Sequence, residues 1–195
     1  MKRYITLCMA ILALMCVFFT FGCSAENPKE ESEEASPTDI TPNDVLYIPD
    51  VHIDGIVLPE EYGEGLYDSA AALWLINEVR DREGLPPFVI GDEKLEDAAV
   101  TRLKEIASDF SHTRPDGRDN KTVFEENEIK YASCGENLAS GQYTAEHVVY
   151  DWLHSESHKA ILFDEKFTYV SIVCGKDAEG IGYWVLLAYE PMQSE

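Results

Sequence analysis

The sequence predicts an α+β domain in which helices cover an antiparallel sheet. Segments with helical periodicity come mainly first in the folded region, and two strand-like segments close it. These closing segments, Tyr169–Cys174 and Tyr183–Ala188, are rich in β-branched and aromatic residues. They flank a short polar stretch, which predicts a hairpin.

Four segments place apolar residues at helical spacing next to a capping or helix-breaking residue: 68–83, 92–110, 144–152 and 155–163. Asp68 or Ser69 can cap the first of them, and Thr144 can cap the third. Between the second and third, Tyr131–Cys134 is predicted to form a strand that Gly135-Glu136-Asn137 follows.

The N-terminus has the pattern of an export signal. Met1-Lys2-Arg3 is positively charged, and Ile5–Gly22 follows without a charge. The end of this run and the cysteine after it, Thr20-Phe21-Gly22-Cys23, resemble the lipobox of bacterial lipoproteins. Residues 1–23 are therefore expected to be a lipoprotein-type signal with Cys23 lipidated. An uncleaved membrane helix and simple secretion are the alternatives.

Composition divides the rest of the chain into three parts. Residues 24–44 are rich in Glu, Ser, Pro and Thr with few large apolar residues, so we expect a disordered acidic tether. Residues 45–66 have strand character broken by proline and glycine and are expected to form an extended arm. Residues 67–195 make up the folded domain.

The net charge and the number of cysteines limit which partners and cross-links the domain can have. Acidic residues outnumber basic ones by 37 to 15, a net charge of −22 that repels phosphate backbones, so no nucleic acid partner is expected. Outside the signal only Cys134 and Cys174 remain. They form one disulfide, as an exported domain permits, or stay two separate buried thiols.

Three residues at the ends of predicted elements are candidates for chemistry: His112, Glu136 and His158. The segments around them occur in a specific order along the chain: Leu75–Arg80, Phe110–His112, Gly135–Ala139 and Trp152–Lys159. With the closing Tyr183-Trp184 strand, this order resembles the CAP superfamily of cysteine-rich secretory, antigen 5 and pathogenesis-related proteins. The resemblance spans about residues 67–191 and is strongest to the bacterial, signal-bearing branch.

The resemblance implies a three-layer α-β-α sandwich with a central cavity lined by His112, Glu136 and His158. Eukaryotic members carry a second glutamate where this chain has Ser155, so the fourth cavity position is not acidic. Glu156-Ser157 also replaces the family's usual proline-glycine before the last histidine. Functions that need a complete acidic cluster are therefore in doubt.

Two imidazoles and a carboxylate can hold a divalent metal. Zinc accepts nitrogen and oxygen ligands, and His112, His158 and Glu136 would leave its fourth position open. In the alternative, both histidines hydrogen-bond Glu136 and shape the cavity floor without a metal.

Two hydrolytic arrangements can be compared with the sequence. The His154–His158 segment lacks the glutamate that a zinc protease places directly after its first histidine, because Ser155 stands there. A nucleophile, base and orienter built from Ser155, His158 and Glu136 has the right residue types, but no nucleophile elbow accompanies them.

The sequence thus favours a non-enzymatic, extracytoplasmic binding domain tethered to the membrane. A lipid or sterol, an envelope component or a protein is the expected partner. A peptidase that uses the same cavity and a purely structural surface protein are the alternatives.

Overall fold

The computed structural model describes residues 52–193. Its helices and strands, in chain order, are η1 (Glu60–Tyr62), α1 (Ser69–Arg82), β1 (Val89–Ile90), α2 (Glu93–Ser108), α3 (Thr122–Glu126), β2 (Tyr131–Ser140), α4 (Ala145–Leu153), α5 (Glu156–Leu162), β3 (Tyr169–Lys176) and β4 (Gly182–Pro191). The predicted signal, the lipidation site Cys23 and the acidic tether lie outside these residues.

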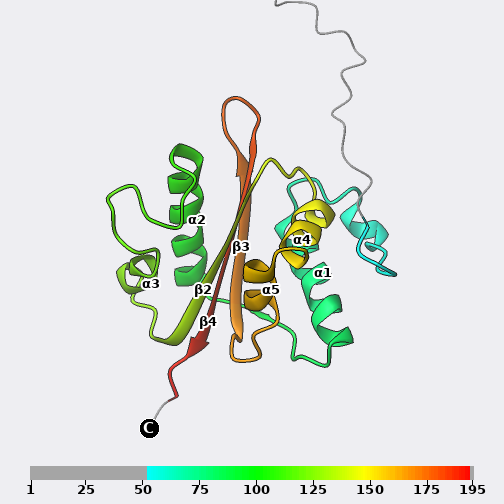
Figure 1. The fold of residues 1–195 in the computed structure, drawn as a ribbon, viewed down its shortest axis with the longest axis horizontal. Coiled ribbons are helices and arrows are strands. Elements are labelled where there is room, and N and C mark those ends of the chain that lie inside the picture. Colours follow the sequence, from blue (N-terminus) through cyan, green and yellow to red (C-terminus); the bar gives the residue numbers. More distant parts are fainter. Residues whose placement is uncertain (1–51, 194–195) are drawn as a thin grey trace, which may run out of the picture. The chain divides into compact units, whose positions relative to one another are not determined.

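Three layers make up the fold. Figure 1 shows α2 and α3 on one side of the sheet and α1, α4 and α5 on the other. One apolar core fills each interface: Trp152 and Trp184 are fully buried on the α1 and α4 side, and Leu95 and Val185 on the α2 side. The α+β class and the α-β-α sandwich are confirmed.

The sheet has the order β1-β3-β4-β2. The predicted hairpin is confirmed, because β3 pairs with β4 antiparallel, and β2 pairs antiparallel with the other side of β4. The two-residue strand β1 was not predicted and pairs parallel to β3. Two residues give too short a pattern to recognise as a strand.

The helix termini follow the capping residues. Asp68 accepts hydrogen bonds from the backbone nitrogens of Ala70 and Ala71 at 2.9 and 3.0 Å, and Thr144 accepts one from His147 at 3.1 Å. The second helix ends at Ser108, earlier than predicted, and leaves Phe110 half exposed in the following loop. The short helix α3 was also missed.

The described part of the arm, residues 52–66, lies on the α1 and α4 layer. Ile53 and Ile56 are buried in the core on this side. Arg82 of α1 donates hydrogen bonds to the backbone oxygens of Asp54 and Gly55 at 2.6 and 2.7 Å. Within residues 52–193, no helix is both long and apolar enough to cross a membrane.

Cys134 and Cys174 are separate thiols rather than a disulfide. They lie on different strands on either side of β4, Cys134 opposite Tyr189 and Cys174 opposite Trp184. Five residues along a strand amount to about 17 Å, far beyond the roughly 7 Å between Cα atoms that a disulfide allows. Burial raises the pKa of Cys174 to about 11, so this thiol is also a poor nucleophile.

The melting temperature of the chain is therefore expected to change by less than about 2 °C when a reducing agent is added. A cross-link between these cysteines would close a loop of about 40 residues and contribute roughly 4 kcal/mol in the chain-entropy model. Thermal unfolding with and without reductant checks this, with the Cys134→Ser/Cys174→Ser double variant as control. A drop of about 10 °C seen only in the unsubstituted chain would contradict the separation of the two thiols.

Candidate functional site

Glu136 lies in the middle of strand β2 with only 5% of its surface exposed. The prediction that the strand ends before Gly135 was wrong, because the ladder to β4 continues through Ser140 and pairs Glu136 with Leu187. A mid-strand position is rigid, so the backbone fixes the place of this carboxylate.

Both oxygens of the Glu136 carboxylate are occupied. Arg102 of α2 donates from Nε to Oε2 at 2.7 Å, while Asn120 donates from Nδ2 to Oε1 at 2.9 Å. Nδ1 of His112 lies 2.9 Å from the same Oε1. A carboxylate accepts hydrogen bonds, so His112 carries its proton on Nδ1 and, when neutral, has its lone pair on Nε2.

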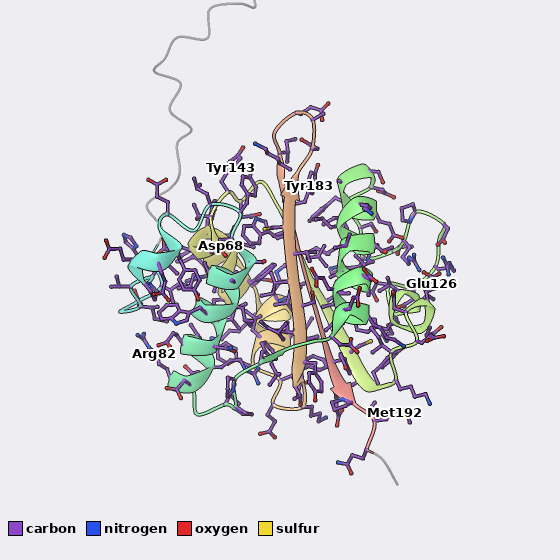
Figure 2. The ribbon with its side chains drawn as sticks, turned by 180° about the vertical axis from the view of Figure 1, so that it is seen from behind. Asp68, Arg82, Glu126, Tyr143, Tyr183 and Met192 are labelled. Carbon is purple, nitrogen blue, oxygen red and sulfur yellow. The ribbon has the colours of Figure 1, made fainter. Side chains whose placement is uncertain are left out.

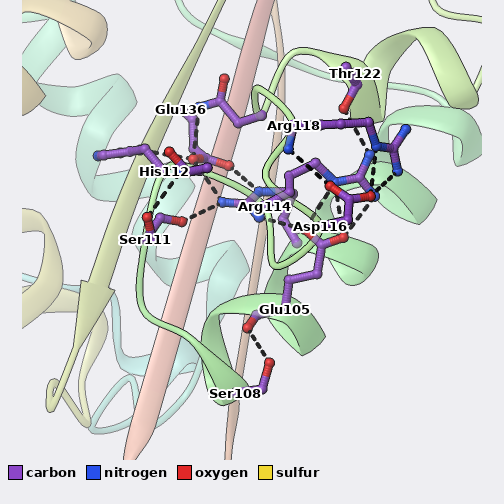
Figure 3. Close-up of polar contacts among 12 residues, drawn as sticks. Glu105, Ser108, Ser111, His112, Arg114, Asp116, Arg118, Thr122 and Glu136 are labelled. Carbon is purple, nitrogen blue, oxygen red and sulfur yellow. Dashed lines mark hydrogen bonds and ion pairs between the residues drawn. The ribbon is translucent and has the colours of Figure 1, made fainter.

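A chain of ion pairs, built on two buried arginines, extends from this carboxylate (Figure 3). Arg102 is fully buried and also bonds Glu105 and the backbone oxygen of Ser111. Arg114 joins the same Glu105 at 2.7 Å and Glu126 of α3 at 2.8 Å. These pairs fasten the loop that carries His112 to both α2 and α3.

His158 approaches the site from α5, on the other side of the sheet. Burial first, and then the nearby His112, lower the pKa of His158 and favour the neutral imidazole. Asn137 donates from Nδ2 to the backbone oxygen of His158 at 3.0 Å and ties α5 to β2. His112 and Glu136 are therefore in direct contact, and the residue after Glu136 holds the backbone of His158.

Ser155 does not join this group through hydrogen bonds. It is the N-cap residue of α5, and its Oγ lies 3.2 Å from Oγ of Ser157. In the described part of the chain no hydrogen bond links Ser155 to His158 or Glu136. The triad that these three residue types suggested is not assembled.

The geometry does not fit the predicted zinc ligands. Among residues 52–193 no three His, Cys, Asp or Glu side chains are grouped so that they could hold a metal ion. The charge of Glu136 is already neutralised by the guanidinium of Arg102, and a metal cation on that carboxylate would meet this positive charge. His158 has no hydrogen bond to Glu136 either, so only the His112 half of the metal-free alternative is observed.

Sequence reasoning missed Arg102 and Asn120. Arg102 stands seven residues after Leu95 and four before Ile106, on the buried face of α2. An arginine at an apolar position of a helix indicates a buried ionic partner. Asn120 lies in a polar loop and gives no comparable signal.

Ionisation of Glu136 is coupled to stability. Burial would raise the pKa of this carboxyl, but hydrogen bonds from His112, Arg102 and Asn120 and the charge of Arg102 outweigh burial and lower the pKa. A lowered folded-state pKa means that the stabilisation is complete above the unfolded value of about 4.3 and is lost as the pH falls through the folded value.

The substitution Arg102→Met is expected to lower the free energy of unfolding by about 3–5 kcal/mol, because it leaves Glu136 buried without its counter-charge. The double variant Arg102→Met/Glu136→Gln should recover part of this loss, since no buried charge then remains. Urea denaturation measures both, with Arg118→Ala as the matched control on an exposed pair. If Arg102→Met costs no more than the control, the buried pair is not what holds the site.

Comparisons with known proteins agree with this architecture. The sequence model of the CAP group, described as the cysteine-rich secretory protein family, matches residues 73–189, which is more than half of the chain. The uncharacterized protein YkwD of Bacillus subtilis (strain 168) is 32% identical over 100 residues, covering 50% of this chain and 38% of that relative. The chain thus matches less than half the length of this relative.

Two solved structures have the same fold. An outer surface protein from Borrelia burgdorferi is similar with a TM-score of 0.56 at 24% identity, over 62% of this chain and 90% of that one. An extracellular protein with an SCP domain from Bacillus anthracis str. Ames gives 0.53 at 23% identity, over 70% and 45%. Given the extent of the family match, this chain belongs to the cysteine-rich secretory protein (CAP) family.

Proposed function

We propose that this chain is an extracytoplasmic CAP domain, tethered to the membrane at Cys23, that binds a ligand between His112 and His158 without transforming it. One observation carries the proposal. The Glu136 carboxylate is fully used by Arg102, Asn120 and His112, so it is available neither as a general base nor as a metal ligand.

The chemistry left to the site is hydrogen bonding by imidazoles. His112 is held by Glu136 and keeps 57% of its side chain exposed, and burial lowers the pKa of the half-buried His158. A neutral imidazole on a rigid scaffold can accept a hydrogen bond from a hydroxyl or N–H group. An envelope component, a lipid or sterol headgroup, or a protein side chain provides such groups.

One observation favours a hydrolase as the second candidate. The contact of His112 Nδ1 with Glu136 is the arrangement by which a carboxylate orients a catalytic imidazole. The nucleophile is what this arrangement lacks, because the hydroxyl of Ser155 contacts Ser157 instead. Binding therefore remains the better account of the geometry.

The proposed location rests on the N-terminal sequence and on relatives. Ile5–Gly22 has the length and composition of an export signal, and Cys23 ends it in a lipobox-like context. Two proteins of the same fold are described as an outer surface protein and an extracellular protein. A domain tethered there would meet envelope components directly.

Histidine NMR signals separate the two candidate functions. We expect lipid, glycan or protein fractions of a cell envelope to shift the ring resonances of both His112 and His158, and we expect His158→Ala to abolish the shift at His112. His147 of α4, whose ring lies beside Asp151 outside the site, is the internal control. The same samples are incubated with a peptide library. Cleavage that disappears in His158→Ala, with no fraction shifting either ring, would replace binding by hydrolysis.

Metabolic labelling tests the tether. Cells that express the chain with a radioactive fatty acid should incorporate label into it, and Cys23→Ala should remove the label while Cys16→Ala keeps it. Lipid attachment at Cys23 needs the thiol of that residue, which explains the expected difference. Label that survives Cys23→Ala, or no label at all, contradicts lipidation at this position.

A further inference from the structure

A cavity of about 360 Å³ lies between the arm and the helices α1, α4 and α5. Arm residues 52–54 form one wall, and the C-terminal parts of α1 and α4 together with α5 form the others. None of the site residues His112, Glu136, Ser155 and His158 lines it. Its size is within the range of small-molecule sites.

Ring side chains make up much of its wall. Tyr150 and His154 stack on each other with centroids 3.8 Å apart, and Phe163 stands beside them in the lining. Ile53, Val79 and Leu153 add apolar surface. Because the two stacked rings cover one face of each other, each keeps at most one face against which a flat apolar ligand can lie.

The charged groups of the lining balance one another. Arg82 and Lys159 are positive, and Asp54 and Glu83 are negative. The cavity thus has no formal net charge on a chain whose net charge is −22. Both terminal nitrogens of Arg82 are bonded to the arm, so Lys159 supplies the donor and Asp54 and Glu83 supply the acceptors. Hydroxyl groups satisfy this combination because a hydroxyl donates and accepts.

The concave surface continues beyond this cavity. A shallow, open depression on α5 shares Glu83, Lys159 and Phe163 with the cavity and adds the carboxylate of Glu156. Nζ of Lys159 lies 4.9 Å from the centre of the Phe163 ring at this junction. A ligand can therefore extend from the cavity into this depression, which favours a molecule of more than one ring.

We propose that the groove formed by the cavity and the adjoining surface of α5 binds a neutral oligosaccharide. Sugar rings combine a flat C–H face, which suits a ring face of the stacked Tyr150 and His154 pair, with a rim of hydroxyls, which suits the mixed charges around that pair. A peptide strand would need free main-chain groups to pair with, and the groove is lined by helices and the arm instead. The inference is independent of the function proposed for His112 and His158.

Calorimetry tests the proposal with the full chain purified in detergent micelles. The probe is triacetylchitotriose, a neutral trisaccharide. Its deacetylated, positively charged counterpart serves for comparison. Both are measured in 0.5 M salt, which screens the long-range attraction between the acidic chain and the charged sugar. We expect saturable binding of the neutral sugar, tighter than that of the charged one. Tyr150→Leu should weaken it about fivefold to tenfold through loss of the ring face.

Two variants serve as controls. Tyr143→Leu removes a tyrosine of similar partial exposure outside the groove and should change the affinity by less than about twofold. His112→Ala should leave the affinity unchanged, because that residue is on the other site. Three results would overturn the proposal: no heat at 10 mM sugar, equal weakening by Tyr143→Leu, or tighter binding of the charged sugar. A sugar concentration of 10 mM is roughly tenfold above the Kd of a weak 1 mM site. Loss of binding in His112→Ala would show that the sugar binds at the site of His112 and Glu136 instead, which also overturns the proposal.

Discussion

The buried ion pair between Arg102 and Glu136 is the interaction on which the rest of the site depends. The carboxylate sits in the middle of a paired strand, and the guanidinium comes from a helix packed on that strand. Such a pair gives little net stability, since desolvation offsets most of the attraction, but it is costly to break from one side. It therefore fixes geometry more than it adds stability. The position of His112 follows from it, because the imidazole bonds to an oxygen that Arg102 and Asn120 already hold in place.

Charged residues have different roles on the surface and in the interior of the domain. The chain as a whole is strongly acidic, yet the buried Arg102 and Arg114 join carboxylates into a connected set on the α2 side (Figure 3). Figure 2 shows Glu126, the outermost member of this set, on that side of the sheet. Arg114, with 5% of its surface exposed, bridges α2 and α3 through Glu105 and Glu126. A loop without an apolar core of its own is thereby ordered by ionic contacts. On the opposite helical layer, apolar packing around Trp152 and the bonds of Arg82 to the arm have the same role.

Much of the fold could be predicted from the sequence, and the site only in part. Helices with clear caps, such as those after Asp68 and Thr144, were predictable because local hydrogen bonding decides where they begin. The two-residue strand β1 was not, since its parallel pairing with β3 depends on contacts distant in sequence. His112 and Glu136 were identified through a family resemblance, which could not reveal that Arg102 satisfies the carboxylate. The disulfide stayed undecided because strand register, not spacing, separates Cys134 from Cys174.

Glu136 and Asn137 are consecutive residues of one strand, and each anchors one of the two histidine-bearing segments of the site. Glu136 holds the loop of His112 on one face of the sheet, and Asn137 holds the backbone of His158 on the other. The loop of His112 and the backbone of His158 are therefore attached to adjacent residues of a single strand. Neither of these two segments can move with its anchoring residue without disturbing the pairing of β2 with β4. The proposed binding site is therefore anchored on both sides before any partner arrives, and a preorganised site loses little conformational freedom on binding.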